Sequence, residues 1–211
     1  MKKLVYAAIA LGALYYFKPG LFDQIPGIPH SAKSQGVVLF TFPDCGRYCD
    51  DAKALLDKKG VIYEHYDVKN DPEGEAKWRR MGGGTAFPIT HIGGERLDGF
   101  HRTKYTHALA SVYGVGMLEG SQRHVVEGNM QKYGDKTVVM YATEWCGYCA
   151  KARKFFTDKG IAYTELDAEK DANARRQYLA LDSRGYPLIY VGTHRFEGWG
   201  PATGKAVREQ L

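Results

Sequence analysis

The chain has 211 residues with an apolar share of 44% and a charged share of 25%, which is typical of a globular protein and excludes a disordered, collagen-like or polytopic membrane protein. Four cysteines are too few for a disulfide-stapled scaffold. The net charge of +5 arises largely at the N-terminus, since residues 1–34 hold four Lys and one Asp, whereas residues 35–134 hold thirteen charges of each sign. No basic stripe is left elsewhere, so binding to nucleic acid is not expected.

The N-terminus has the pattern of an export signal. Lys2 and Lys3 precede an uncharged apolar run over residues 4–17, and basic residues before such a run hold that end of the chain in the cytoplasm. We therefore predict a signal or anchor helix over residues 1–18, with the rest of the chain outside the cytoplasm and tethered to a membrane through this segment. A cytoplasmic protein that begins with an ordinary buried helix is the alternative.

The length of this segment and the residues at its end give opposite indications of whether it is cleaved. A helix of about fourteen residues spans about 21 Å, which is shorter than a hydrocarbon core of about 30 Å and favours cleavage. Tyr15, Tyr16 and Phe17 before Lys18 favour a retained anchor instead, because aromatic residues gather at membrane interfaces. Residues 19–35, which are rich in Pro and Gly, are expected to form an irregular spacer.

The rest of the chain contains one unit twice. When the segment from Val37 is aligned with the segment from Thr137, each copy has a cysteine pair, a later Lys-Gly, and then a Tyr and an Asp at matched positions. Further on, Phe87-Pro88 matches Tyr186-Pro187. So many matches in the same order indicate a duplicated domain. The sequence predicts domains over residues 36–113 and 136–211, joined by a linker over residues 114–135.

Each copy predicts the same order of elements, which is strand, helix, strand, helix, strand, strand, helix. Short β-rich runs predict the strands, and apolar residues at helical spacing after each cysteine pair predict the first helix. The expected fold class is therefore α/β, with a central mixed sheet flanked by helices in each domain. The strands are expected at 37–42, 62–68 and 89–92 in the first copy and at 138–141, 162–166 and 188–191 in the second, each copy adding a short fourth strand.

The cysteine pair of the second copy carries the candidate chemistry. Cys146 and Cys149 are three residues apart at a strand-to-helix junction, so they share one helix face and can form a disulfide. The first cysteine lies where unpaired N–H groups and the helix dipole favour a negative charge. Its thiol pKa is expected to fall from about 8.5 into the range of roughly 3.5–7.5. We interpret Cys146 as the nucleophile and Cys149 as the resolving thiol.

The first copy has an extra residue in its pair. Cys45 and Cys49 are four apart, a spacing that still allows a shared helix face. The extra residue, with Arg47 the candidate, must either distort the helix start or move Cys49. Asp44, Asp50 and Asp51 flank this pair and oppose a thiolate. Cys45 and Cys49 are thus candidate redox residues, and the alternative is a module that only docks substrate or provides spacing.

The cysteines could in principle serve two other uses, a shared zinc site or a structural disulfide. A shared zinc site needs both pairs on one ion, but they lie almost a hundred residues apart in equivalent positions of two repeats. A purely structural disulfide across one helical turn closes a very small loop and stabilises little. No metal is therefore expected.

Both repeats resemble glutaredoxin domains of the thioredoxin superfamily, through the cysteine pair after a strand, the aromatic-proline pair and the closing Gly-x-aromatic. The resemblance implies thiol–disulfide oxidoreductase activity on protein disulfides or small thiols, without a bound cofactor. It also implies a cis proline beside the active site, whose preceding residue binds a thiol peptide. These positions, together with the aromatic residues beside the second pair, are the expected substrate-binding residues: Tyr186, Pro187, Phe87, Pro88, Trp145 and Tyr148.

The resemblance leaves the thiol partner and the role of two aromatic residues open. Glutaredoxins that use glutathione usually carry a lysine shortly before the first cysteine, and neither repeat has one, so glutathione is a candidate co-substrate only. Arg175, Arg176 or Arg184 could supply the cation instead. Trp145 is expected either to face substrate or to pack in the core, and Tyr148 to shield the pair.

Two functions from other classes remain as alternatives. The repeats could form a non-catalytic protein-binding module in which the cysteines stay oxidised. The first active-site cysteine could also hold an iron–sulfur cluster between subunits, as in some glutaredoxins.

Overall fold

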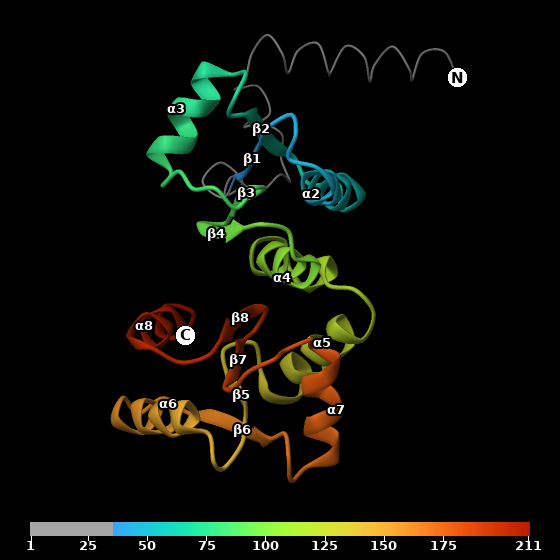
Figure 1. Cartoon of the computed structure of the whole chain (residues 1–211). Helices are drawn as coiled ribbons and strands as arrows, with labels where there is room; N and C mark the ends of the chain where they lie inside the picture. The colour runs from blue at the N-terminus through green and yellow to red at the C-terminus, as the bar shows by residue number, and fades with distance from the viewer. Residues whose placement is uncertain (1–35) are drawn as a thin grey trace, which may run out of the picture. The chain divides into compact units, whose positions relative to one another are not determined.

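The computed structural model describes residues 36–211 (Figure 1). The predicted signal or anchor helix and the spacer lie outside these residues and remain predictions. Within residues 36–211, no helix is both long enough and apolar enough to cross a membrane.

Repeat 1 (residues 36–113) has the predicted order of elements. They are β1 (Val37–Thr41), α2 (Arg47–Lys58), β2 (Tyr63–Asp67), α3 (Pro72–Arg80), β3 (Ile89–Ile92), β4 (Glu95–Asp98) and α4 (Arg102–Tyr113). The sheet has the order β2-β1-β3-β4, in which β1 and β2 are parallel and the other pairs are antiparallel. Helices α2 and α4 cover one face of this sheet and α3 covers the other (Figure 1).

Repeat 2 (residues 136–211) has the same topology. Its elements are β5 (Val138–Ala142), α6 (Gly147–Asp158), β6 (Tyr163–Asp167), α7 (Ala172–Ala180), β7 (Leu188–Val191), β8 (His194–Glu197) and α8 (Pro201–Glu209). Its sheet has the order β6-β5-β7-β8, again with one parallel pair. The predicted α/β class with two thioredoxin-like domains is therefore confirmed, while the hydrophobic helix before them lies outside the described residues.

Local sequence explains most element ends. Asp71 and Asp171 accept backbone N–H bonds at the start of α3 and α7, as N-cap residues do. Gly60 and Gly160 follow the last turns of α2 and α6 at φ +65° and +62°, a left-handed conformation that glycine adopts without steric cost. The central strands β1 and β5 are buried along their whole length, so each forms the middle of a core covered on both faces.

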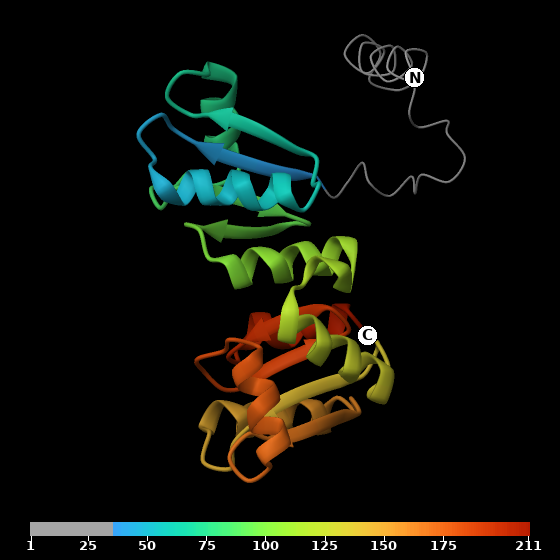
Figure 2. The same cartoon turned by 90° about the vertical axis from the view of Figure 1, so that its right-hand side faces the viewer.

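The predicted linker between the repeats is largely helical. It contains a short 3-10 helix (Val115–Met117) and α5 (Gly120–Tyr133). Val125 and Val126 of α5 belong to the same buried cluster as Val139 and Tyr141 of β5, and the side-chain amide of Asn129 donates to the Tyr141 hydroxyl at 2.9 Å. Helix α5 therefore packs on the sheet of repeat 2, on the side that α7 also covers (Figure 2).

The two repeats contact each other through α4 and β8. The Thr103 hydroxyl of α4 donates to Asp182 at 2.7 Å. The Arg195 guanidinium of β8 donates to the Tyr190 hydroxyl at 2.8 Å, and the buried His107 ring lies 3.4 Å from both groups. Side-chain hydrogen bonds thus link the last helix of repeat 1 to the last two strands of repeat 2.

Candidate active site

The cysteine pair of repeat 2 lies at the start of α6. Cys146 is the N-cap residue of this helix, and its Sγ accepts a hydrogen bond from the backbone N–H of Cys149 at 3.0 Å. The two cysteines form a disulfide, with their Cα atoms 5.1 Å apart. Cys146 is 6% exposed and Cys149 is fully buried, so the sulfur of Cys146 is the one closer to solvent.

Aromatic side chains surround this pair. Trp145 is 70% exposed, so it does not pack in the core; its indole N–H donates to Glu169 at 2.8 Å. Its ring meets the ring of Tyr186 edge-on with centroids 6.2 Å apart, and Tyr186 stacks on Tyr178. Tyr148 is also largely exposed. The site thus has an accessible aromatic surface beside a nearly buried disulfide.

Both aromatic-proline bonds have the geometry that the family resemblance implied. The peptide bonds Phe87-Pro88 and Tyr186-Pro187 are cis. In each repeat the backbone N–H of a later glycine donates to the proline carbonyl, from Gly99 at 2.9 Å and from Gly198 at 2.8 Å. The equivalent loops of the two repeats therefore have the same backbone arrangement.

Two ion pairs lie near Cys146. Glu144 forms an ion pair with Lys170, which holds the pKa of the Glu144 carboxyl below its usual value. Arg153 is paired with Glu165 at 2.7 Å. Beyond these ion pairs, the backbone N–H groups at the start of α6 and the helix dipole provide positive potential at the sulfur of Cys146.

The cysteine pair of repeat 1 is arranged differently. Cys45 and Cys49 form a disulfide with Cα atoms 5.8 Å apart, but the N-cap of α2 is Gly46 at φ +71°, with no side-chain cap. Cys49 is the third residue of α2, as Cys149 is the third residue of α6. The extra residue therefore changes the helix start and leaves Cys49 in place. Because Arg47 lies inside the helix, the position of the extra residue is that of Gly46.

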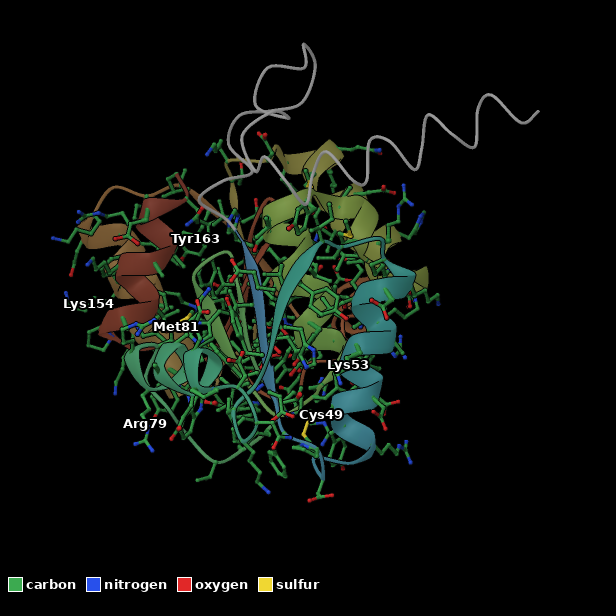
Figure 3. All side chains as sticks on the ribbon, turned by 90° about the horizontal axis from the view of Figure 1, so that it is seen from above. Cys49, Lys53, Arg79, Met81, Lys154 and Tyr163 are labelled. Atoms are coloured by element: carbon green, nitrogen blue, oxygen red, sulfur yellow. A yellow bond between two sulfur atoms is a disulfide. The ribbon has the colours of Figure 1, made fainter. Side chains whose placement is uncertain are left out.

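A cavity of 170 Å³ lies beside this pair. Its lining includes Cys45, Cys49, Lys53 and His65, and Figure 3 shows Lys53 next along α2 from Cys49. The His65 ring contacts the Thr41 hydroxyl at 2.8 Å. The pKa of His65 is lowered by burial and by the nearby charge of Lys53.

Sequence reasoning missed one part of the repeat 2 site. Arg153 lies one turn after Cys149 on α6, and its guanidinium donates to both carboxylate oxygens of Glu165 and to the Thr143 carbonyl at 3.0 Å. A comparison of the repeats contains the signal, because the equivalent pair in repeat 1 is Lys53 and His65. Repeat 2 has an ion pair where repeat 1 has two basic residues, so the surroundings of the two cysteine pairs differ.

Among residues 36–211, no cluster of three or more His, Cys, Asp or Glu side chains could hold a metal ion. Each cysteine pair is closed within its own repeat.

The fold and the site define a class of protein with two tandem thioredoxin-like domains, each with a cysteine pair at a helix start and a cis proline directly before its third strand. The glutaredoxin family model matches residues 37–97 and 138–196, and the chain belongs to this family.

The chain is also similar in sequence to individual glutaredoxins. Glutaredoxin 1 of Rickettsia typhi is 42% identical over 65 residues, which are 30% of this chain and 62% of that protein. Glutaredoxin 1 of Rickettsia prowazekii is 40% identical over 65 residues, 30% of this chain and 67% of that protein. The match to the first relative thus covers less than two thirds of its length. A crystal structure of a buckwheat glutaredoxin–glutathione complex is similar with a TM-score of 0.33 and 20% identity, covering 44% of this chain and 84% of that one.

Proposed function

We propose that the chain is a thiol–disulfide oxidoreductase in which Cys146 is the nucleophile and Cys149 the resolving thiol. The observation that carries the proposal is the position of the Cys146 sulfur at the N-cap of α6, where it accepts the N–H of Cys149 at 3.0 Å. In the reduced protein this N–H and the helix dipole stabilise a thiolate, which is the reactive form of the thiol.

The exchange takes place in two balanced steps. The Cys146 thiolate attacks one sulfur of a substrate disulfide, forms a mixed disulfide and releases the other sulfur as a thiolate. The Cys149 thiolate then attacks the Cys146 sulfur, forms the intramolecular disulfide and releases the second substrate thiolate. Overall, the substrate disulfide gains two electrons and the dithiol loses two. The reverse sequence oxidises a substrate dithiol.

The substrates proposed are protein disulfides and small thiols such as glutathione. The exposed rings of Trp145 and Tyr148 and the backbone beside Tyr186-Pro187 offer a surface for the chain that flanks a substrate sulfur. Neither repeat provides a lysine before its first cysteine, so protein disulfides are the favoured class. Comparing the rates at which the protein reduces insulin disulfides and a mixed disulfide with glutathione tests this choice.

Exchange chemistry is assigned to repeat 2 rather than repeat 1. The cap position of α2 is taken by Gly46, and no sulfur caps that helix. The pair in repeat 1 is therefore expected to exchange more slowly, and its cavity and cis proline suit a role in holding substrate.

A trapping experiment tests the proposal. Cys149→Ser removes the resolving thiol, so a mixed disulfide between Cys146 and a substrate protein should accumulate and be released by reductant. The matched control is Cys49→Ser in repeat 1, which should accumulate less. The proposal fails if Cys146 traps no partner and is alkylated at the same rate as free cysteine across pH.

A further inference from the structure

We propose that Arg153 is a positioning residue that holds the Cys146 loop in its reactive geometry, an inference that rests on the function proposed above. Arg153 lies on α6 and connects this helix to two other parts of repeat 2. Its Nε and Nη2 atoms donate to the carboxylate of Glu165 on β6 at 2.9 and 2.7 Å. Its Nη2 also donates to the Thr143 carbonyl at 3.0 Å.

The Thr143 carbonyl is the point that links Arg153 to the nucleophile. The backbone N–H of Cys146 donates to this same carbonyl at 3.4 Å. Repeat 1 forms the equivalent turn with a lysine in place of the arginine, and there the Cys45 N–H donates to the Phe42 carbonyl at 3.1 Å. In repeat 2 the guanidinium braces the turn that places Cys146 at the N-cap of α6. A shift of this turn would separate the Cys146 sulfur from the Cys149 N–H, which is the bond that stabilises the thiolate.

The role is positional because the charge of Arg153 is already neutralised. Glu165 faces the guanidinium in a two-point ion pair, and both side chains are roughly 70% buried, with 27% and 29% exposed. A planar guanidinium can make three such bonds in fixed directions, whereas a lysine ammonium is a point charge on a flexible stem. Arg153→Lys thus keeps the positive charge and removes the fixed set of hydrogen bonds to Glu165 and to the Thr143 carbonyl.

Repeat 1 lacks this clamp. The equivalent positions hold Lys53 and His65, and these two side chains line a 170 Å³ cavity beside Cys45 and Cys49. Both side chains are basic, so they do not attract each other, and burial, followed by the charge of Lys53, lowers the pKa of His65. The repeat without the clamp is also the repeat in which glycine has taken the cap position.

The test measures the reactivity of Cys146 directly. The parent is the full-length protein with Cys45, Cys49 and Cys149 changed to Ser, and the alkylation rate of its Cys146 is measured across pH. The same measurement is made after adding Arg153→Lys, and after adding Arg153→Lys together with Glu165→His, which places the residues of repeat 1 at both positions. Both variants are expected to raise the apparent thiol pKa. With the other cysteines intact, disulfide exchange at pH 7 should fall by roughly tenfold or more, as misplaced reacting groups cause.

Lys154→Ala is the matched control. Lys154 follows Arg153 on α6 and pairs with Asp158 at 2.9 Å in an exposed ion pair on the same helix. Its loss should leave both the pH profile and the exchange rate unchanged. Melting temperatures are recorded for every variant. If Arg153→Lys lowers the melting temperature strongly, Glu165→Gln provides a second measurement. This variant keeps the guanidinium and its bond to Thr143, so it should raise the thiol pKa of Cys146 by less than Arg153→Lys does.

The possible results separate the two proposals. Ordinary reactivity of Cys146 in the parent protein contradicts the proposed function itself. A reactive Cys146 whose pH profile is the same in the parent, Arg153→Lys and Glu165→Gln contradicts the positioning role and leaves the proposed function intact. A lower melting temperature with an unchanged thiol pKa shows that Arg153 is only structural, and it also overturns the inference.

Discussion

Cys146 and Cys45 are the first cysteines of the two pairs, and their sulfur atoms have different backbone surroundings. Cys146 caps α6 and accepts an N–H bond at 3.0 Å, whereas Cys45 precedes a glycine cap. Asp50, in the first turn of α2, adds a negative charge near the pair of repeat 1. A thiolate is therefore better stabilised at Cys146 than at Cys45.

This difference predicts two separate thiol pKa values. In variants that retain only Cys146 or only Cys45, with the other three cysteines changed to Ser, Cys146 should titrate in the range of roughly 3.5–7.5 and Cys45 near 8.5. Absorbance of the thiolate at 240 nm during pH titration gives both values. Equal values for the two residues would contradict the role assigned to the helix cap.

Tyr141 shows how a single hydroxyl joins elements of repeat 2. The ring is fully buried, and its hydroxyl accepts a hydrogen bond from the Asn129 amide of α5 at 2.9 Å and donates one to Gln177 of α7 at 3.1 Å. Burial raises the pKa of this phenol to about 12, so it stays protonated and keeps its donor role at neutral pH.

Tyr141→Phe should destabilise the protein by about 1–3 kcal/mol, because the amide of the buried Asn129 would lose its partner. The free energy of unfolding from urea titration measures the loss. Tyr148→Phe removes an equivalent hydroxyl from an exposed ring and is the control that should change stability little. A loss of the same size in both variants would show that the network of Tyr141 contributes nothing specific.

At the scale of elements, one residue decides how α2 begins. Cys49 and Cys149 each occupy the third position of their helices, so helix packing fixes the second cysteine, and the insertion is absorbed at the N-terminal end. Gly46 absorbs it at φ +71°, a conformation that is unfavourable for residues with a Cβ.

Deletion of Gly46 should convert the pair of repeat 1 into a second active one. It restores a spacing of three and moves Cys45 to the cap position, so the thiol pKa of Cys45 should fall. With repeat 2 inactivated by Cys146→Ser and Cys149→Ser, reduction of insulin disulfides should rise by about tenfold relative to the undeleted parent. Arg47→Ala, at a largely exposed side chain, keeps the length of the loop and should not raise activity. Absence of any gain in folded protein would mean that spacing is not what limits repeat 1.

At the scale of the whole molecule, the repeats are connected by buried polar groups. His107 of α4 is 4% exposed and lies between Tyr190 and Arg195 of repeat 2. Burial, and then the charge of Arg195, lower the pKa of this imidazole to about 3. The folded protein therefore keeps His107 neutral, whereas the unfolded chain protonates it near pH 6.5.

The free energy of unfolding should consequently decrease as pH falls from about 6.5 toward 3. In this window the unfolded state binds a proton that the folded state does not, while above pH 6.5 both states are neutral and the full stability is retained. His107→Gln should flatten this dependence in urea titrations at pH 7, 5 and 4. His124→Gln, at an exposed position on α5, is the control. The same slope in His107→Gln and wild type would rule out this histidine as a source of the acid sensitivity.

The sequence predicted most of the fold because its signals are local and occur twice. Strands β3 and β7 have the predicted limits, and the ends of the other strands differ by one residue or so. The cysteine pairs and the two aromatic-proline positions were also found from sequence. Short β-rich runs, glycine after each first helix and repeated motifs all depend on short-range chemistry.

Long-range contacts decided the rest. The glycines of residues 114–135 suggested a linker, but burial of Val125 and Val126 against β5 stabilises a helix there, since tertiary packing overrides weak local preference. The Arg153–Glu165–Thr143 contacts join residues ten or more positions apart, and no local pattern specifies such a meeting. The choice between a moved Cys49 and a changed helix start also required the packed core, which keeps Cys49 at 3% exposure. The sequence by itself thus determined two glutaredoxin repeats and their four sulfur atoms. Only the tertiary structure showed which sulfur receives a backbone N–H, because that depends on where each helix starts once its core is packed.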